Sequence, residues 1–286
     1  MKHNYLAWQQ NMGNTWVGFS AYCMRQLGQL RELDINYNIT DNADYKVCND
    51  WSSIRWNGTG NFWHEGDALP YDNSWEYYFE NQIQSTESDF IESSGEYKDD
   101  YVPTPGTKNF RDTTELEIYG KLVNMYFKPK IHVIESLNST ITDKKTLGVH
   151  IRRSNMGWYH PDAYLGWSDD EYFNKVMNIF NKHGFEKIYL ATEEYSIYNY
   201  FNERVPEILL GIDTCYRVGS DQMLEYSLVD KTTRPLHVYN SGLEVLVDTL
   251  NLSNCHSMLC FLSGVTSIAC FFNNNKFNDV YYFDEI

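Results

Sequence analysis

This chain of 286 residues lacks several patterns that mark common binding and targeting functions. It has no uninterrupted apolar run of about 18 residues, so we expect no transmembrane segment. Its N-terminus also lacks the apolar core of a signal peptide. Neither a Gly-x-Gly-x-x-Gly nor a Walker sequence is present, so NAD and ATP binding have no support. Without an Asp-x-Asp pair, or histidines and cysteines at metal-ligand spacing, we expect no metal site.

Paired cysteines and basic residues are also scarce. The six cysteines are scattered and form no Cys-x-x-Cys pair, which favours reduced thiols and a cytoplasmic protein. The 23 Lys and Arg against 39 Asp and Glu leave a net charge of −16. A surface this acidic repels nucleic acid and anionic membranes, so we expect neither as a partner. An anion site in such a chain must be local.

The most informative stretch present is Thr146-Leu-Gly-Val-His-Ile-Arg-Arg-Ser-Asn155. An apolar run ends in His150, Arg152 and Arg153, and loop-forming residues follow. This order predicts a buried strand that carries two guanidinium groups at its C-terminal edge, where ligands of open α/β sheets bind. Arginine pairs bidentately with phosphate or carboxylate, so the tip is a candidate anion site. A strand end with two solvated arginines remains the alternative.

Strand and helix patterns alternate from residue 146 onward. Apolar strand patterns cover 147–151, 187–191, 208–212, 257–261 and 280–283, and helical patterns cover 169–183, 195–202, 240–252 and 263–272. Ser168 is the predicted N-cap of the first of these helices, and Gly184 ends it. Strands separated by helices of this length predict a parallel, doubly wound sheet.

The first half gives weaker signals. A strand at 5–8, a turn, a helix at 17–30 with Gly28 as its C-cap and a strand at 33–37 predict one α/β unit, and further helices are expected at 113–126 and 131–137. Residues 38–112 show little periodicity and are interpreted as an irregular insertion, with 87–107 as a mobile loop. The polar stretch 139–145 then divides an N-terminal domain, 1–140, from a C-terminal domain, 146–286.

Three blocks of the second half resemble the α1,6-fucosyltransferase family, which includes the rhizobial nodulation enzymes, and more distantly the α1,2- and protein O-fucosyltransferases. They are Gly148-Val-His-Ile-Arg-Arg153, Ile188-Tyr-Leu-Ala-Thr-Glu-Glu194, and Val245-Leu-Val-Asp248 through Cys260-Phe-Leu-Ser263. The resemblance implies a GT-B architecture, in which two Rossmann-like domains face a cleft. The C-terminal domain would then hold a GDP-sugar and the N-terminal domain would contact the acceptor.

The resemblance also implies roles for single residues. Arg152 would bind the donor diphosphate, His150 and Asp248 the guanine and ribose side, and Ser263 a phosphate. Tyr172 corresponds to a donor-site tyrosine, and Glu193 and Glu194 to the acids that follow the second strand. Charge on the diphosphate would be met by Arg152, Arg153 and the helix N-terminus at 263–267, which includes Ser267. We therefore expect Arg152, Glu193 and Glu194 to be catalytic, and no cofactor beyond the GDP-sugar donor.

The expected activity is metal-independent, inverting transfer of fucose from GDP-fucose to a glycan. The family follows its arginines with Asp and Lys, whereas this chain has Asn155 and Met156. Transfer from another GDP-sugar and a non-catalytic relative that binds nucleotide or carbohydrate therefore stay open.

Several residues also have plain structural interpretations. The general base is Glu193, Glu194, His160 or Asp162, in no firm order. The glutamates could instead serve the following helix through its dipole. His150 could be a core histidine and Asp248 a surface acid. Residues 158–162 could be an acceptor platform or a loop plug.

Overall fold

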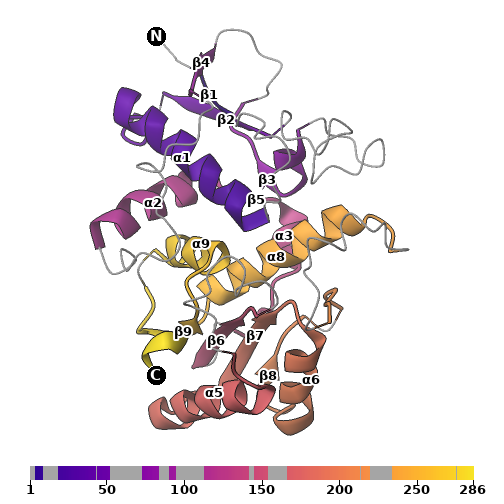
Figure 1. Cartoon of the computed structure of the whole chain (residues 1–286). Helices are drawn as coiled ribbons and strands as arrows, with labels where there is room; N and C mark the ends of the chain where they lie inside the picture. The colour runs from indigo at the N-terminus through magenta and orange to yellow at the C-terminus, as the bar shows by residue number, and fades with distance from the viewer. Residues whose placement is uncertain are drawn as a thin grey trace.

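The protein, described here by a computed structural model, is an α/β chain with a parallel β-sheet in each half of the sequence (Figure 1). The structure describes residues 4–8, 19–42, 44–51, 73–83, 90–94, 113–141, 145–153, 166–212, 214–219, 234–274 and 276–286. The predicted α/β class with two parallel sheets is confirmed. None of the helices in this part of the chain is both long and apolar enough to span a bilayer.

The C-terminal sheet has five parallel strands in the order β10-β9-β6-β7-β8. They are β6 (Thr146–Ile151), β7 (Lys187–Thr192), β8 (Leu209–Leu210), β9 (Ser257–Cys260) and β10 (Val280–Tyr282). The chain winds outward from β6 first to β7 and β8, and then on the other side to β9 and β10. The order therefore reverses between β6 and β9, which makes the carboxyl ends of these two strands the topological switch point of the sheet.

Local signals set the helices of this half: α5 (Asp169–His183), α6 (Tyr195–Arg204), α8 (His237–Ser253) and α9 (Gly264–Asn273). Ser168 forms a capping box with Glu171 at the start of α5, and Gly184 ends the helix at φ 63°, as predicted. Helix α8 begins at His237, before the predicted start at residue 240, which is next to Ser241. The Ser241 hydroxyl donates to the His237 carbonyl inside the helix, so this polar residue is not a cap.

The N-terminal sheet is formed by β1 (Asn4–Trp8), β2 (Lys46–Asp50) and β4 (Phe90–Glu92), and α1 (Phe19–Tyr37) lies beside it. The predicted strand at 33–37 is wrong, because these residues form the last turn of α1. Leu33 is fully buried at helical spacing from Leu30, whereas Ile35 is 50% exposed. Gly28 is buried inside this helix and does not cap it.

The prediction that 38–112 is an irregular insertion is wrong for its described parts. This range supplies β2 and β4, the 3₁₀ helix η2 (Ser74–Tyr77) and β3 (Phe79–Glu80), which pairs with β5 (Lys128–Pro129). Trp51 and Trp75 are fully buried, and the Trp75 ring stacks on Phe79 with centroids 4.3 Å apart. Strand β4 lies within the predicted mobile loop 87–107, and residues 95–107 lie outside the described part of the chain.

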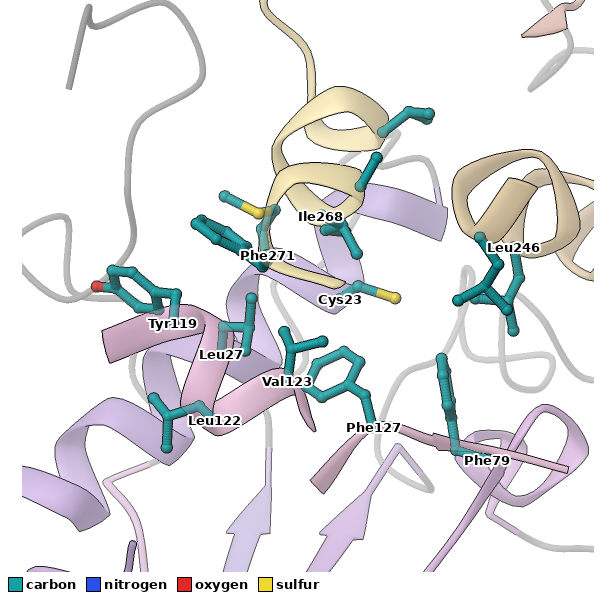
Figure 2. Packing of buried hydrophobic residues seen from close by; sticks show 14 of the residues in the cluster. Cys23, Leu27, Phe79, Tyr119, Leu122, Val123, Phe127, Leu246, Ile268 and Phe271 are labelled. Atoms are coloured by element: carbon teal, nitrogen blue, oxygen red, sulfur yellow. The ribbon is translucent and has the colours of Figure 1, made fainter. Parts of the chain in front are cut away.

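One apolar core spans both halves of the sequence. Helices α2 (Thr113–Tyr126), α8 and α9 lie between the two sheets (Figure 1), together with the short helix α3 (Ile131–Glu135). Figure 2 shows Phe271 and Ile268 of α9 beside residues of α1 and α2, and the Phe271 ring lies 5.2 Å from that of Tyr119. A shared apolar core opposes rotation of one half against the other. The domain boundary at 139–145 stays a prediction, with 142–144 outside the described residues.

Close packing of Gly242 against Tyr78 predicts that Gly242→Ala is destabilising. An added Cβ at Gly242 would lie 2.4 Å from the Tyr78 hydroxyl oxygen, which donates to the Tyr239 carbonyl. Alanine normally stabilises a helix interior relative to glycine. Here overpacking should instead lower the free energy of unfolding by about 1–3 kcal/mol, measured by denaturant titration. Tyr78→Phe removes the nearest atom and should recover part of the loss. A Gly242→Ala variant as stable as wild type would contradict this packing.

Candidate functional site

Arg152 and Glu193 face each other at the carboxyl edge of the C-terminal sheet. Strands β6 and β7 are paired in register up to Ile151 and Thr192, so the residues that follow continue side by side. Arg152 Nε lies 3.3 Å from Glu193 Oε1, and the two side chains are 23% and 12% exposed. The pair therefore offers a partly accessible guanidinium group at the tip of β6, next to the switch point.

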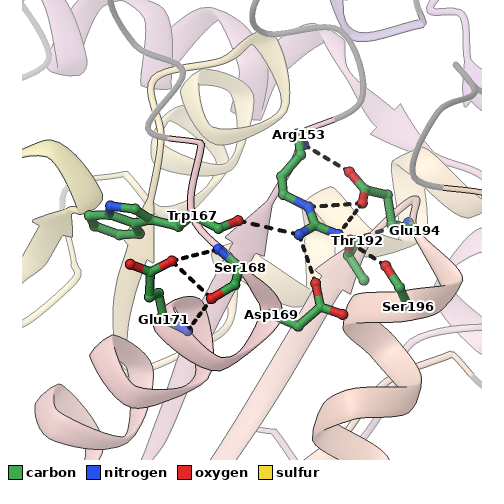
Figure 3. A network of polar contacts seen from close by, with 8 residues as sticks. All are labelled: Arg153, Trp167, Ser168, Asp169, Glu171, Thr192, Glu194 and Ser196. Carbon is green, nitrogen blue, oxygen red and sulfur yellow. Dashed lines mark hydrogen bonds and ion pairs between the residues drawn. The ribbon is translucent and has the colours of Figure 1, made fainter.

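Arg153 and Glu194, one residue further along each chain, form a second and more buried ion pair (Figure 3). The Arg153 guanidinium uses all five of its N–H groups within the protein. It donates from Nε and Nη2 to Glu194 Oε2, from Nη1 to Asp169 and to the Trp167 carbonyl, and from Nη2 to the Ser196 hydroxyl. These contacts occupy the N–H groups that the predicted donor binding by Arg153 would need.

Glu194 is fully buried, and its carboxylate is engaged by Arg153. Oε1 accepts from the Arg153 backbone N–H at 3.1 Å, and Oε2 accepts from the guanidinium at 2.7 and 2.9 Å. Glu194 occupies the N-cap position of α6, but its side chain makes no capping hydrogen bond. This burial and these partners favour a structural role for Glu194, and its catalytic role stays a prediction. Glu193 is the more accessible of the two acids.

His150 lies inside β6 and is 6% exposed, on the strand face that also carries Gly148. Burial, and then the charge of Arg152, lower the pKa of His150 to about 3, so the ring is neutral at physiological pH. Its Nδ1 has no hydrogen-bond partner among the described residues.

Asp248 links α8 to β7. The Tyr189 hydroxyl donates to Asp248 Oδ1 at 2.5 Å and accepts from the Asn251 side-chain amide at 2.9 Å. Burial raises the pKa of Asp248 to about 7, against the lowering effects of the Tyr189 hydrogen bond and of Arg217. Asp248 is therefore not an ordinary solvated surface acid.

The N-terminus of α9 follows β9 at the switch point. His150 and Cys260 are partners in the β6–β9 pairing, so the tips of both strands are adjacent. Ser263 is partly exposed and forms a capping box with Thr266. Ser267 is 1% exposed, and its hydroxyl donates to the Ser263 carbonyl one turn earlier in the same helix. Its side chain is therefore buried and bonded within α9. A Cβ added at Gly264 would lie 2.8 Å from the Ser20 hydroxyl, so the first turns of α9 and α1 are in contact.

Tyr172 belongs to the core and not to the accessible edge. It is 1% exposed, and its ring meets those of Trp167 and Phe283 edge-on at 5.3 and 5.5 Å. The Arg153 guanidinium lies 5.8 Å from the ring centroid. The structure therefore places Tyr172 behind the Arg153–Glu194 pair, where it supports the site from the core side.

A second group of charged residues, which the sequence did not predict, lies near Asp248. Arg217 is 3% exposed, lies 3.7 Å from the Tyr198 ring centroid and donates to the Ile212 carbonyl. Arg234 forms a bidentate ion pair with Glu244 of α8. No motif or periodicity marks these positions, so only their spatial placement reveals them.

Several predicted residues cannot be placed. Asn155, Met156, His160 and Asp162 lie outside the described residues. In the part of the chain that the structure describes, no three His, Cys, Asp or Glu side chains gather in a group that could hold a metal ion.

Comparisons with known proteins find similarity in structure alone. No protein-family model matches the chain, and no curated protein matches its sequence. NodZ alpha-1,6-fucosyltransferase soaked with GDP-fucose is 13% identical, with a TM-score of 0.48 over 95% of this chain and 93% of that one. Fucosyltransferase NodZ from Bradyrhizobium is 12% identical, with a TM-score of 0.45 over 94% and 92%. POFUT1 in complex with GDP-fucose is 10% identical, with a TM-score of 0.39 over 99% and 74%.

Proposed function

We propose that the chain is a glycosyltransferase that transfers fucose from GDP-fucose to a glycan. The observation that carries this proposal is that Arg152 follows β6 and the N-terminus of α9 follows β9, two strands that are paired up to their adjacent C-terminal ends. A guanidinium fork and the N–H groups at a helix N-terminus both favour a phosphate group. Their meeting at the switch point of a doubly wound sheet suits a nucleoside diphosphate.

In the proposed reaction, an acceptor hydroxyl attacks the anomeric carbon of the sugar from the face opposite the diphosphate. The new carbon–oxygen bond forms as the bond to the diphosphate breaks, and GDP leaves with the bonding electron pair. Arg152 and the α9 amides would stabilise the charge that develops on the leaving diphosphate. Because these groups supply the positive charge, we propose that transfer needs no metal ion.

The hydroxyl proton needs an acceptor, and we propose Glu193 for this role. It is the partly exposed acid beside the proposed donor site, 3.3 Å from Arg152 Nε, and it would have to accept the proton on the acceptor side of the sugar. His160 and Asp162 remain the alternatives from the sequence. The neutral ring of His150 and the carboxyl group of Asp248 would lie on the guanine and ribose side, as the family resemblance implies.

Release of GDP from a panel of GDP-sugars, with mixed glycan acceptors and EDTA present, tests this proposal. We expect turnover with GDP-fucose that EDTA does not reduce and that Glu193→Gln lowers by at least about a hundredfold. Activity that disappears with EDTA and returns with manganese would refute the metal-independent mechanism. Turnover with a different GDP-sugar would reassign the donor.

The second candidate is a non-catalytic relative that binds the nucleotide, favoured by Asn155 and Met156 where the family has Asp and Lys. Tight GDP binding without turnover of any GDP-sugar in the panel would select it.

A further inference from the structure

We propose that Arg153 is a positioning residue and not a phosphate ligand: with Glu194, it holds Arg152 and Glu193 in the geometry that the donor site needs. This inference rests on the proposed function, since it assigns the donor charge to Arg152 alone of the two adjacent arginines. It concerns the two ion pairs that continue the register of β6 and β7 beyond the end of the sheet.

The Arg153 side chain joins three segments that are distant in sequence. It starts at the tip of β6, reaches Glu194 and Ser196 in the turn into α6, and reaches Asp169 in the first turn of α5 (Figure 3). The Glu194 carboxylate in turn accepts from the Arg153 backbone N–H. Side chain and main chain are thus bound to the same residue, which restricts both the position and the direction of the β6 tip.

The turn that carries Glu193 is held from its other side as well. The Val218 N–H donates to the Glu193 carbonyl at 2.7 Å, and the Tyr195 N–H donates to the Val218 carbonyl at 3.1 Å. Because the backbone of this turn is restrained on both sides, its position places Glu193 Oε1 3.3 Å from Arg152 Nε. Loss of the Arg153–Glu194 pair would release one of these restraints.

Burial makes this pair costly to break. The Arg153 and Glu194 side chains are 12% and 0% exposed. Although burial opposes its charged form, the hydrogen bonds and charges of Glu194 and Asp169 raise the pKa of Arg153. Removal of one partner leaves a buried charge without its counter-ion, which is strongly unfavourable. A diphosphate would have to displace these contacts to bind Arg153, whereas Arg152 lies at the accessible edge.

The Glu194→Gln substitution distinguishes a phosphate ligand from a positioning residue at Arg153, because the two roles predict opposite changes in GDP affinity. It removes a negative charge near the proposed anion site and keeps the shape of the side chain. If Arg153 were a ligand, loss of its counter-ion would free it and GDP would bind more tightly. If Arg153 is a positioning residue, the β6 tip and the turn lose their common anchor, and GDP should bind about tenfold more weakly.

The experiment measures GDP affinity by calorimetry and turnover of GDP-fucose in four variants and a matched control. We expect Glu194→Gln to weaken both, Asp169→Asn to do so to a smaller extent, and Arg153→Lys to retain more activity than Arg153→Ala. The matched control is Asp170→Asn: Asp170 is exposed, lies in the same turn of α5 and accepts from the Tyr200 and Asn174 side chains. It should leave GDP affinity unchanged. If Glu194→Gln does not fold, Asp169→Asn carries the test with the same expected sign.

Hydrogen exchange of the ligand-free protein gives a readout that does not depend on the proposed function. Glu194→Gln, or Asp169→Asn in its place, should speed exchange of the amides at 152–153 and 193–196, and Asp170→Asn should not. Unchanged exchange there would overturn the inference, as would GDP affinity equal to or above that of wild type. A wild-type protein that binds no GDP, with exchange altered as expected, would instead refute the proposed function and leave the anchoring role of Arg153 in place.

Discussion

Arg152→Ala is expected to weaken GDP binding by at least about a hundredfold, because two charge-assisted hydrogen bonds to the diphosphate would be lost. The side chain is only 23% exposed and lies beside Glu193, so its removal also leaves a carboxylate facing the anion. Arg152→Lys should recover only part of the affinity, since an ammonium group supplies a point charge and no fork. Calorimetric titration with GDP measures all three proteins.

Arg204→Ala is the matched control for this substitution. Arg204 is at the last turn of α6, stacks on the Tyr200 ring and is largely exposed, so its removal changes the net charge equally without touching the switch point. It should leave the affinity for GDP near that of wild type. Equal GDP affinity in wild type and Arg152→Ala would show that the diphosphate site has been placed wrongly.

His150→Gln and Asp248→Asn are expected to change the pH dependence of stability in opposite directions. The pKa of His150 is about 3, against an ordinary value of 6.5, so between these values the unfolded chain takes up a proton that the folded protein does not. Wild type therefore loses stability through this group as the pH falls below about 6.5. The His150→Gln variant lacks this loss, and should gain about 2 kcal/mol relative to wild type between pH 6.5 and 4.5.

The sign is reversed for Asp248, whose pKa is about 7 against an ordinary value of 3.8. The folded protein holds a proton here that the unfolded chain has already released, so this contribution is complete below about pH 3.8 and is lost as the pH rises through 7. Asp248→Asn should therefore lose about 2 kcal/mol relative to wild type between pH 6.5 and 4.5. Asparagine can still accept from Tyr189, so the comparison isolates the titration.

Denaturant titrations of the three proteins at pH 4.5, 5.5 and 6.5 measure these differences. Two differences that shift in the same direction would contradict the assignment, because the two groups carry opposite linkage signs. A difference independent of pH for either variant would show that the group is solvated in the folded protein.

The C-terminal half was predictable because its signals are local. Each strand there is a short apolar run. The N-cap Ser168 and the C-cap Gly184 stand directly before and after the residues of α5. The N-terminal half was not, because its burial depends on distant partners. Strand β2 has the sequence Lys-Val-Cys-Asn-Asp, and its Asn49 is buried. The Asn49 side-chain oxygen accepts a hydrogen bond from the Gln26 amide, and the Gln26 oxygen accepts one from the Trp51 indole. No local sequence pattern predicts a strand whose buried polar side chains form their hydrogen bonds with distant segments of the chain.

The sequence by itself determined the α/β class, the strand that contains His150 and precedes Arg152 and Arg153, and a helix that starts near residue 263. Composition, periodicity and capping chemistry act over a few residues, so they can be recognised along the chain. Only the tertiary structure decided which of the two adjacent arginines is accessible. Arg152 pairs with Glu193 at the open edge, while Arg153 is surrounded by Glu194, Asp169 and Ser196, because consecutive side chains at the end of a strand point to opposite sides.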